Sequence, residues 1–260
     1  MHEGGLLPLL IAGLFGALIG SFLNVCIYRL PRQESIAWPG SHCPKCAHPI
    51  AWYDNIPILS YSALGGRCRH CTVRIPFCYP LVEILNASGY VALLWVFGPS
   101  WVTVVYGLFY SALLVVAGTD FSHKIIPNAV TFPGIIVGLV CATTVLPLGF
   151  LDSLLGVLVG GGILWLLAWA SPYLFGKEGM GGGDIKLLAM IGAFLGWQPA
   201  LITIMVGSLL GSLVGVTLIA AQVIKREDYI PFGPFLVCGA LVALFFSRSL
   251  LDWYQGLMAG

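Results

Sequence analysis

Long apolar runs alternate with short polar stretches along most of the chain, and this pattern predicts membrane-spanning helices. A helix needs about 17–25 mostly apolar residues to cross a bilayer. Runs of this kind occupy residues 5–28, 80–97, 101–119, 129–148, 151–175, 200–224 and 232–254. A further run at residues 185–197 would extend only about 20 Å as a helix, so it predicts either a thin span or a half helix. We count it as a span, which gives about eight transmembrane helices.

The composition leads to the same fold class. Hydrophobic residues make up 58% of the chain and charged residues only 9%, whereas soluble domains carry about 25% charged residues. We therefore expect an all-α polytopic integral membrane protein, in contact with membrane lipid. The net charge of +1 gives no basic field for nucleic acid, so we expect no nucleic-acid partner. The first run is expected to stay as a helix, because no Lys or Arg precedes it and Arg29 and Arg32 follow it.

The few Lys and Arg residues indicate how the chain is oriented. If the N-terminus lies outside, the inside loops hold eleven of the 12 Lys and Arg residues, Lys177 among them. Only Arg248, in the last helix, falls elsewhere. If residues 185–197 did not cross, Lys225 and Arg226 would lie outside, so the same rule favours eight spans. The longer loops, residues 29–79, 119–128 and 176–184, are then all inside, and we expect the function on the cytoplasmic side.

A cysteine pattern in the first of these loops predicts a metal site. Cys43 and Cys46 form one C-x2-C pair, Cys68 and Cys71 form a second, and 21 residues separate the pairs. Two such pairs can supply four thiolates to one zinc ion. Four thiolates leave no open position for water, so the zinc would be structural. We expect a small zinc-stapled cytoplasmic insertion between helices 1 and 2. The alternative is unmetallated thiols or a redox pair; disulfides are not expected in a reducing compartment.

Two carboxylates are predicted to lie at the same membrane face. Asp120 lies at the inner end of the third span, and Asp184 opens the sixth. Ionisable side chains at the edge of a bilayer are costly and indicate a functional site. Two adjacent carboxyl groups share a proton, so one can act as a base on water and the other as an acid toward a carbonyl oxygen. The pair therefore predicts aspartic peptide hydrolysis, with no assignment of which member holds the proton.

The glycines before Asp184 have two interpretations. Gly181, Gly182 and Gly183 lack a Cβ atom, so the backbone can adopt unusual dihedral angles and approach another chain closely. A strip of open backbone amides could pair with an extended substrate segment. The other interpretation is a flexible loop before a helix. Beside Asp184 and opposite Asp120, we favour docking of a substrate backbone.

Glu83 is a further acidic residue in a predicted span. It lies near the cytoplasmic end of the second helix. It would either line the site or pair with Arg74 or Lys124.

Two other classes of function are open at this point. A transporter could use the paired carboxylates to bind a cation or to relay protons, but it would favour carboxylates near the midplane and an inverted repeat. An assembly scaffold built on the cysteine loop would leave the run of glycines before Asp184 without a role.

The motifs along the chain resemble those of the type IV prepilin peptidases, which are bifunctional leader peptidases and N-methyltransferases. The resemblance covers nearly the whole chain and includes a GxGD pattern at Gly181, Gly183 and Asp184. The other matching stretches are GSFLNVCIYRLP at residues 20–31, the double C-x2-C loop with WYDNIPILSY between the pairs, IPFCYPLVE, TDFSHKIIPN at residues 119–128, and GMGGGDIKLL at residues 179–188. Asn128 stands where many relatives have an aspartate.

The resemblance implies a GxGD-type intramembrane aspartic protease in the bacterial inner membrane, with its active site facing the cytoplasm. Such enzymes cut the basic leader from prepilins and pseudopilins after a glycine, and most methylate the new N-terminal residue with S-adenosylmethionine. The catalytic pair then corresponds to Asp120 and Asp184, and the zinc ligands to Cys43, Cys46, Cys68 and Cys71. No motif in the chain independently indicates a site for S-adenosylmethionine.

The expected organisation has three parts. Residues 1–28 form the first transmembrane helix, residues 29–79 the zinc-binding loop domain, and residues 80–260 the polytopic membrane peptidase domain.

Overall fold

The computed structural model is built from helices, which confirms the predicted all-α fold. It describes residues 5–175, 181–225 and 230–259. Lys177, Arg226 and the first two residues of GMGGGDIKLL lie outside the described residues. Within the described ranges the only extended pairings are two isolated β-bridges in the cysteine loop.

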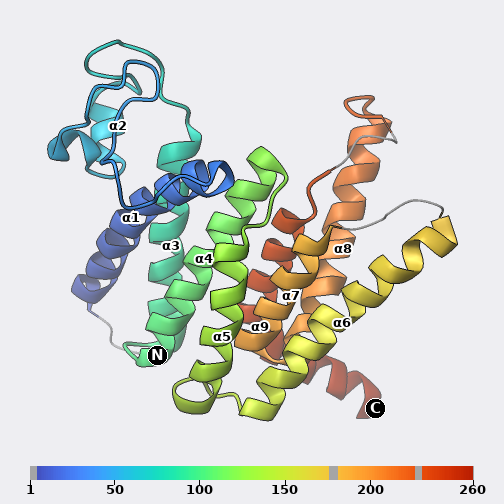
Figure 1. Ribbon diagram of the computed structural model, residues 1–260. Helices are drawn as coiled ribbons and strands as arrows, with labels where there is room; N and C mark the ends of the chain where they lie inside the picture. Colours follow the sequence, from blue (N-terminus) through green and yellow to red (C-terminus); the bar gives the residue numbers. More distant parts are fainter. Residues whose placement is uncertain (1–4, 176–180, 226–229, 260) are drawn as a thin grey trace. The chain divides into compact units, whose positions relative to one another are not determined.

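The helices follow the apolar runs of the sequence (Figure 1). Their bounds are α1 Leu6–Arg29, η1 Leu30–Arg32, η2 Trp52–Asn55, α2 Leu59–Ala63, α3 Cys78–Phe97, α4 Trp101–His123, α5 Asn128–Thr144, α6 Phe150–Phe175, α7 Gly182–Leu195, α8 Trp197–Ala220 and α9 Gly233–Ala259. Among the described residues, 6 helices are long and apolar enough to cross a membrane: α1, α3, α4, α6, α8 and α9. The predicted eight spans also count α5, with 17 residues, and α7, with 14. That count stays a prediction.

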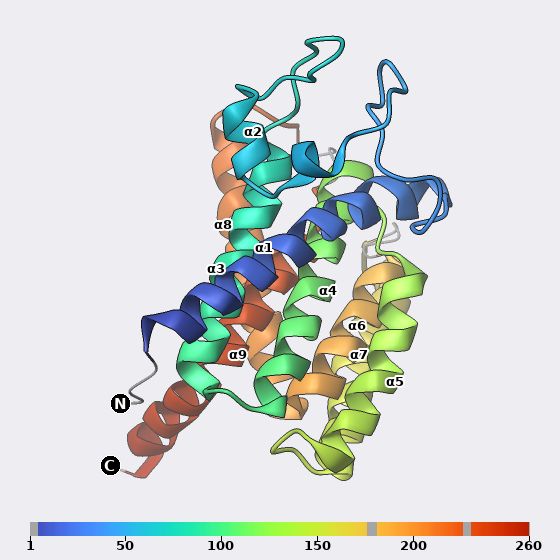
Figure 2. The ribbon, with the colours of Figure 1, turned by 90° about the vertical axis from the view of Figure 1, so that its left-hand side faces the viewer.

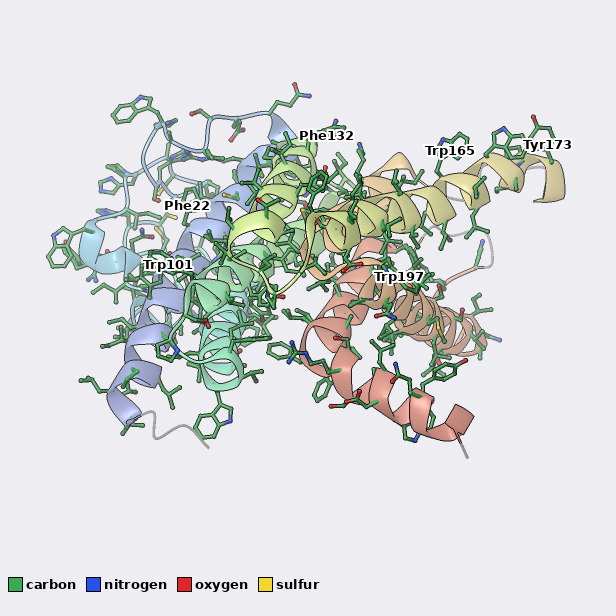
Figure 3. All side chains as sticks on the ribbon, turned by 90° about the horizontal axis from the view of Figure 1, so that it is seen from below. Phe22, Trp101, Phe132, Trp165, Tyr173 and Trp197 are labelled. Carbon is green, nitrogen blue, oxygen red and sulfur yellow. The ribbon has the colours of Figure 1, made fainter. Side chains whose placement is uncertain are left out.

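Large apolar side chains point outward along the helices, as expected of a protein embedded in a lipid bilayer. Figure 3 shows Trp165 and Tyr173 projecting from α6, with Phe132 on α5. More than half of the surface of each of these side chains is exposed. A water-soluble protein rarely exposes so much contiguous apolar surface. The chain is therefore a multi-pass membrane protein.

The chain divides into two compact units, Met1–Val115 and Val116–Gly260, with the division inside α4. In the first unit, α1 crosses α3 (Figure 2). Glycines of α1 let the backbones approach, because a Cβ atom on Gly20 would lie 2.8 Å from the Cα atom of Glu83. Beside the crossing, the buried Asn86 side chain donates a hydrogen bond of 2.7 Å to the carbonyl oxygen of Gly16. Small residues and buried polar bonds are how helices associate in lipid.

In the second unit, α7 is the central helix (Figure 1). It contacts α5, α6, α8 and α9, and it is buried at every position from Leu187 to Leu195. Gly156 of α6 and Gly192 of α7 meet backbone to backbone, and the Ser153 hydroxyl donates a 2.6 Å hydrogen bond to the Ala193 carbonyl oxygen. With 14 residues, α7 is about 21 Å long. A helix apolar on all sides is expected to be buried in this way.

The end of α4 differs from the prediction. The third span was expected to end at Thr119, but α4 continues to His123. The helix stops where Lys124 adopts a left-handed conformation with φ of 56° and its N–H bonds to the Asp120 carbonyl oxygen at 2.8 Å. This is a common way for a helix to terminate. Asp120 therefore lies in the last turn of a helix rather than in a loop.

Candidate active site and metal centre

The two C-x2-C pairs come together in the first unit. One ligand atom from each of Cys43, Cys46, Cys68 and Cys71 lies within 4.8 Å of the others. The sulfur atoms of Cys43 and Cys71 are 3.8 Å apart. A tetrahedral zinc site with bonds of about 2.3 Å places its sulfur atoms about 3.8 Å apart. The geometry and the soft thiol donors therefore fit a zinc site with four cysteine ligands.

The two cysteine pairs sit in matching backbone turns, a feature that the sequence reasoning missed. The N–H of Cys43 bonds to the His48 carbonyl oxygen, and the N–H of Cys68 bonds to the Val73 carbonyl oxygen, each at 2.9 Å. The residue after each pair, Ala47 or Thr72, has a positive φ. Residues 41–50 and 66–75 are thus two copies of one knuckle. The signal in the sequence was the isoleucine that follows each pair at the same distance.

Polar contacts order the rest of the loop. Arg69 forms an ion pair with Asp54, at 2.6 Å and 2.8 Å from its two carboxylate oxygens. The hydrogen bonds from this guanidinium hold the pKa of the Asp54 carboxyl below its ordinary value. Arg29, at the end of α1, donates hydrogen bonds to the carbonyl oxygens of Ser35 and Pro39.

In the second unit, Asp120 is buried at the junction of α4 and α9. Its side chain is 3% exposed. Its Oδ2 atom accepts a hydrogen bond of 2.9 Å from the backbone N–H of Gly233, the first residue of α9. The N–H groups at a helix start carry partial positive charge and favour a carboxylate.

Gly233 is a site residue that the sequence reasoning missed. A Cβ atom at this position would lie 2.6 Å from Oδ2 of Asp120 and 3.1 Å from its Cγ atom. Only glycine lets the start of α9 come this close to the carboxylate. The signal that could have found it is the break PFGPF at the start of the last apolar run.

Asp184 lies in the first turn of α7 and is 4% exposed. It is close enough to Asp120 for the two carboxyl groups to interact electrostatically. The structure thus brings the predicted pair together, between the end of α4 and the starts of α7 and α9.

The three glycines before Asp184 do not share one environment. Gly181 caps α7 in an extended conformation, and Gly182 and Gly183 belong to its first turn. None of them has a positive φ, so the expected unusual dihedral angles are absent. A Cβ atom on Gly182 would have no neighbour within 4 Å, whereas one on Gly183 would lie 3.0 Å from the Cβ atom of Ile126. The open space lies at Gly182, and Gly183 is a packing position.

Asn128 and Glu83 have defined partners. The Lys186 ammonium, in the first turns of α7, donates a hydrogen bond to Asn128 at the start of α5. In the first unit, the Glu83 carboxylate accepts a hydrogen bond of 2.7 Å from the N–H of Ile58. The alternatives for Glu83 were to line the site or to pair with Arg74 or Lys124, and the structure shows this bond to the backbone of the loop in place of an ion pair with Arg74.

The fold and the site define a class of protein. It is a multi-pass membrane protein with two buried, interacting carboxyl groups where helix ends meet, and paired carboxyl groups are the machinery of aspartic peptide hydrolases.

Comparison with known proteins narrows this class. Residues 14–97 match the bacterial peptidase A24 N-terminal domain, and residues 107–216 match the type IV leader peptidase family. A prepilin leader peptidase/N-methyltransferase of Aeromonas salmonicida is 38% identical over 93% of this chain and 91% of its own length. Its counterpart in Pseudomonas aeruginosa is 37% identical over the same shares of the two chains. A third, from Myxococcus xanthus, is 41% identical over 82% of this chain and 64% of its own.

The chain therefore belongs to the type IV leader peptidase family. The cysteine cluster falls in the first matched segment, and both aspartates fall in the second. No solved structure matches the chain.

Proposed function

We propose that this protein removes the leader peptide from type IV prepilins and pseudopilins, and that it methylates the new N-terminal residue with S-adenosylmethionine. Membership of the family supports both activities, because its relatives are named prepilin leader peptidase/N-methyltransferases. The observation that carries the protease assignment to particular residues is the burial of Asp120 and Asp184 as an interacting pair.

The proposed cleavage uses the two aspartates in different roles. One carboxylate takes a proton from a water molecule, whose oxygen attacks the carbonyl carbon of the scissile bond, while the other carboxyl protonates the carbonyl oxygen. The tetrahedral intermediate then collapses. The C–N bond breaks, the nitrogen of the new N-terminus receives a proton, and the product carboxyl group forms on the leader.

We assign the base to Asp120. Both aspartates lie beside a helix start, but among the described residues only Asp120 of the pair accepts a backbone N–H, that of Gly233, and such a bond favours the charged carboxylate. Asp184 then holds the proton and acts as the acid. The starts of α7 and α9 both face the pair, so two helix dipoles offset its single negative charge.

The cysteine cluster is proposed to bind one structural zinc ion. Four thiolates fill the coordination shell, so the metal would hold the loop together rather than activate water. The loop, residues 29–79, is small and has few buried apolar residues, and metal binding would supply the free energy that its core lacks. The three-part division of the chain at residues 28 and 79 stays a prediction.

The protein is proposed to lie in the bacterial inner membrane with the aspartate pair facing the cytoplasm. A basic leader remains on the cytoplasmic side for the reason that Lys and Arg remain in inside loops, while the apolar pilin helix stays in lipid. The bond between leader and helix then falls at the membrane face. The strip of backbone at Gly181, Gly182 and Gly183 is proposed to dock the extended substrate there.

The test is cleavage of a purified prepilin by the full chain in detergent, with S-adenosylmethionine, read by mass spectrometry of the product N-terminus. The wild-type protein should give a product with one added methyl group. Asp120→Asn and Asp184→Asn should each reduce cleavage at least about a thousandfold, because neither remaining group can do both proton transfers.

Asp152→Asn, at the other end of the helix bundle, is the matched control and should cleave normally. Equal amounts of each variant in the membrane and an unchanged thermal unfolding midpoint check that it is folded. Near-normal cleavage of prepilin by either of the two dyad-aspartate variants, Asp120→Asn or Asp184→Asn, would refute the mechanism. The comparisons give no support to a transporter.

A further inference from the structure

A cavity in the first unit is lined by neither of the two aspartates. It has a volume of about 500 Å³ and lies between the end of α1, the start of α3 and the cysteine loop. Sites for small molecules and cofactors commonly measure about 300–1,000 Å³. The cavity is therefore large enough for a ligand of nucleoside size.

Among the described residues of the lining, the acid Glu83 and the cations Arg74 and Arg29 form no ion pair, and Arg29 is held by backbone carbonyl oxygens. Glu83 is 8% exposed, and its partner in the loop is the neutral N–H of Ile58. Arg74 also lines the cavity, and among the described residues its guanidinium has no ion-pair partner. The other acid of the lining, Asp54, is already paired with Arg69. A ligand with a positive and a negative group would satisfy both Glu83 and Arg74.

The lining also contains aromatic rings. Tyr61 and Tyr79 face the cavity, from α2 and from the first turn of α3. Tyr28 and Tyr53 line it too, but their rings already carry the guanidinium groups of Arg32 and Arg69. Flat rings beside a pocket suit a purine base, and they also favour a cation.

The wall beside Glu83 is conformationally strained. Ile58 has φ of 63° and ψ of −48°, which a β-branched residue adopts rarely, and Leu59 N–H bonds back to the Pro57 carbonyl oxygen at 2.5 Å. The hydrogen bond to Glu83 holds this tight turn at the edge of the cavity. Such strain persists where the surrounding structure holds a site in place.

From these features we propose that this cavity binds the methyl donor, with Glu83 facing the sulfonium group and Arg74 binding the α-carboxylate. The proposal rests on the proposed N-methyltransferase activity and gives it a location. S-adenosylmethionine carries a purine, a sulfonium cation and a carboxylate, and each has a counterpart in the lining. The cavity lies at the C-terminal end of α1 and the N-terminal end of α3, the ends that the distribution of Lys and Arg predicts to be cytoplasmic.

The first test measures binding of the donor to the purified full chain by equilibrium dialysis with labelled S-adenosylmethionine and S-adenosylhomocysteine. Glu83→Gln keeps an acceptor for Ile58 but removes the charge. This variant should bind S-adenosylmethionine about tenfold more weakly or worse. Its binding of S-adenosylhomocysteine should change much less, because the sulfur of that ligand is an uncharged thioether. Arg74→Gln should weaken both ligands to the same extent, because both carry the carboxylate.

Each variant has a matched control outside the cavity. Glu34 is an exposed acid of the same loop, and Arg67 is the backbone partner of Arg74 in the second knuckle. Glu34→Gln and Arg67→Gln should bind both ligands as the wild-type chain does. Equal affinities for Glu83→Gln and Glu34→Gln would overturn the proposal.

A second measurement locates the ligand without any substitution. Ultraviolet cross-linking of labelled S-adenosylmethionine should mark peptides that contain Tyr61, Tyr79 or Glu83, and excess S-adenosylhomocysteine should remove the label. Label confined to residues 116–260 would overturn the proposal. A preparation that cleaves prepilin but binds no donor would also overturn it, whereas a preparation that binds the donor and cuts no prepilin would contradict the proposed protease instead.

Discussion

At the scale of single residues, the two aspartates differ in the hydrogen bonds that their carboxyl groups accept. Both aspartates are almost fully buried. Among the described residues, a backbone N–H is donated to the carboxylate of Asp120 alone of the two, from Gly233 at 2.9 Å. The contact depends on a glycine, since a Cβ atom there would lie 2.6 Å from the carboxylate oxygen.

Gly233→Ala is expected to displace the Asp120 carboxylate and to lower prepilin cleavage about a hundredfold, because a misplacement of about 1 Å costs that much in an aligned reaction. Gly215→Ala in α8 is the control, since its Cβ atom would make only an ordinary contact of 3.6 Å with Ile230. Rates from single-turnover cleavage assays check this. Equal rates for the two variants would remove Gly233 from the site.

The sequence predicted Asp120 and Asp184 but not Gly233, for a physical reason. A carboxylate in an apolar run is conspicuous because it is costly there. A glycine in an apolar run has many explanations, and only the approach of α9 to α4 distinguishes them. The hydrogen bond between Lys186 and Asn128 was equally out of reach, because it joins the starts of two helices far apart in sequence.

At the scale of elements, the start of α7 combines Asp184, the proposed acid, with open backbone. The glycines were expected to provide unusual dihedral angles, but they are helical or extended. What Gly182 provides is space, since no atom lies within 4 Å of a Cβ placed on it. The substrate-docking hypothesis can therefore be tested at Gly182 without disturbing the packing of α7.

Gly182→Val should reduce cleavage by about tenfold or more if a substrate backbone lies against it, because the branched side chain would fill that space. Gly162→Val in α6 is the matched control, as that glycine also has open space around it. The readouts are cleavage rate and the amount of protein in the membrane. Loss of both in the Gly182 variant would mean that the glycine serves folding alone.

At the scale of the whole molecule, the number of crossings depends on α7. The helix pattern was predictable for the long runs, because lipid imposes length and apolarity together. The sequence could not decide whether α7 crosses the membrane, because its 14 residues are enclosed by four other helices rather than by lipid. Burial by protein relaxes the length requirement.

Fusions of a periplasm-dependent alkaline phosphatase would settle the topology. A fusion after Ser100, between α3 and α4, is expected to be active, and one after Gln222, beyond α8, to be inactive. The second result requires α7 to cross, by the distribution of Lys and Arg. Activity at both positions would mean that α7 is not a span.

The matching turns around the two cysteine pairs have a consequence for the loop. Because both knuckles present their thiols through the same backbone bonds, a metal ion would be coordinated alike if the two exchanged places. The metal alone therefore cannot decide which way round the loop sits on its helices. That choice falls to contacts that have no counterpart in the other knuckle. The Asp54–Arg69 pair ties η2 to the second knuckle, and the bond from Ile58 to Glu83 ties the loop to α3. In this protein the zinc ion would determine the fold of the insertion, and the contacts of two acidic side chains, Asp54 and Glu83, would determine its orientation on the helices.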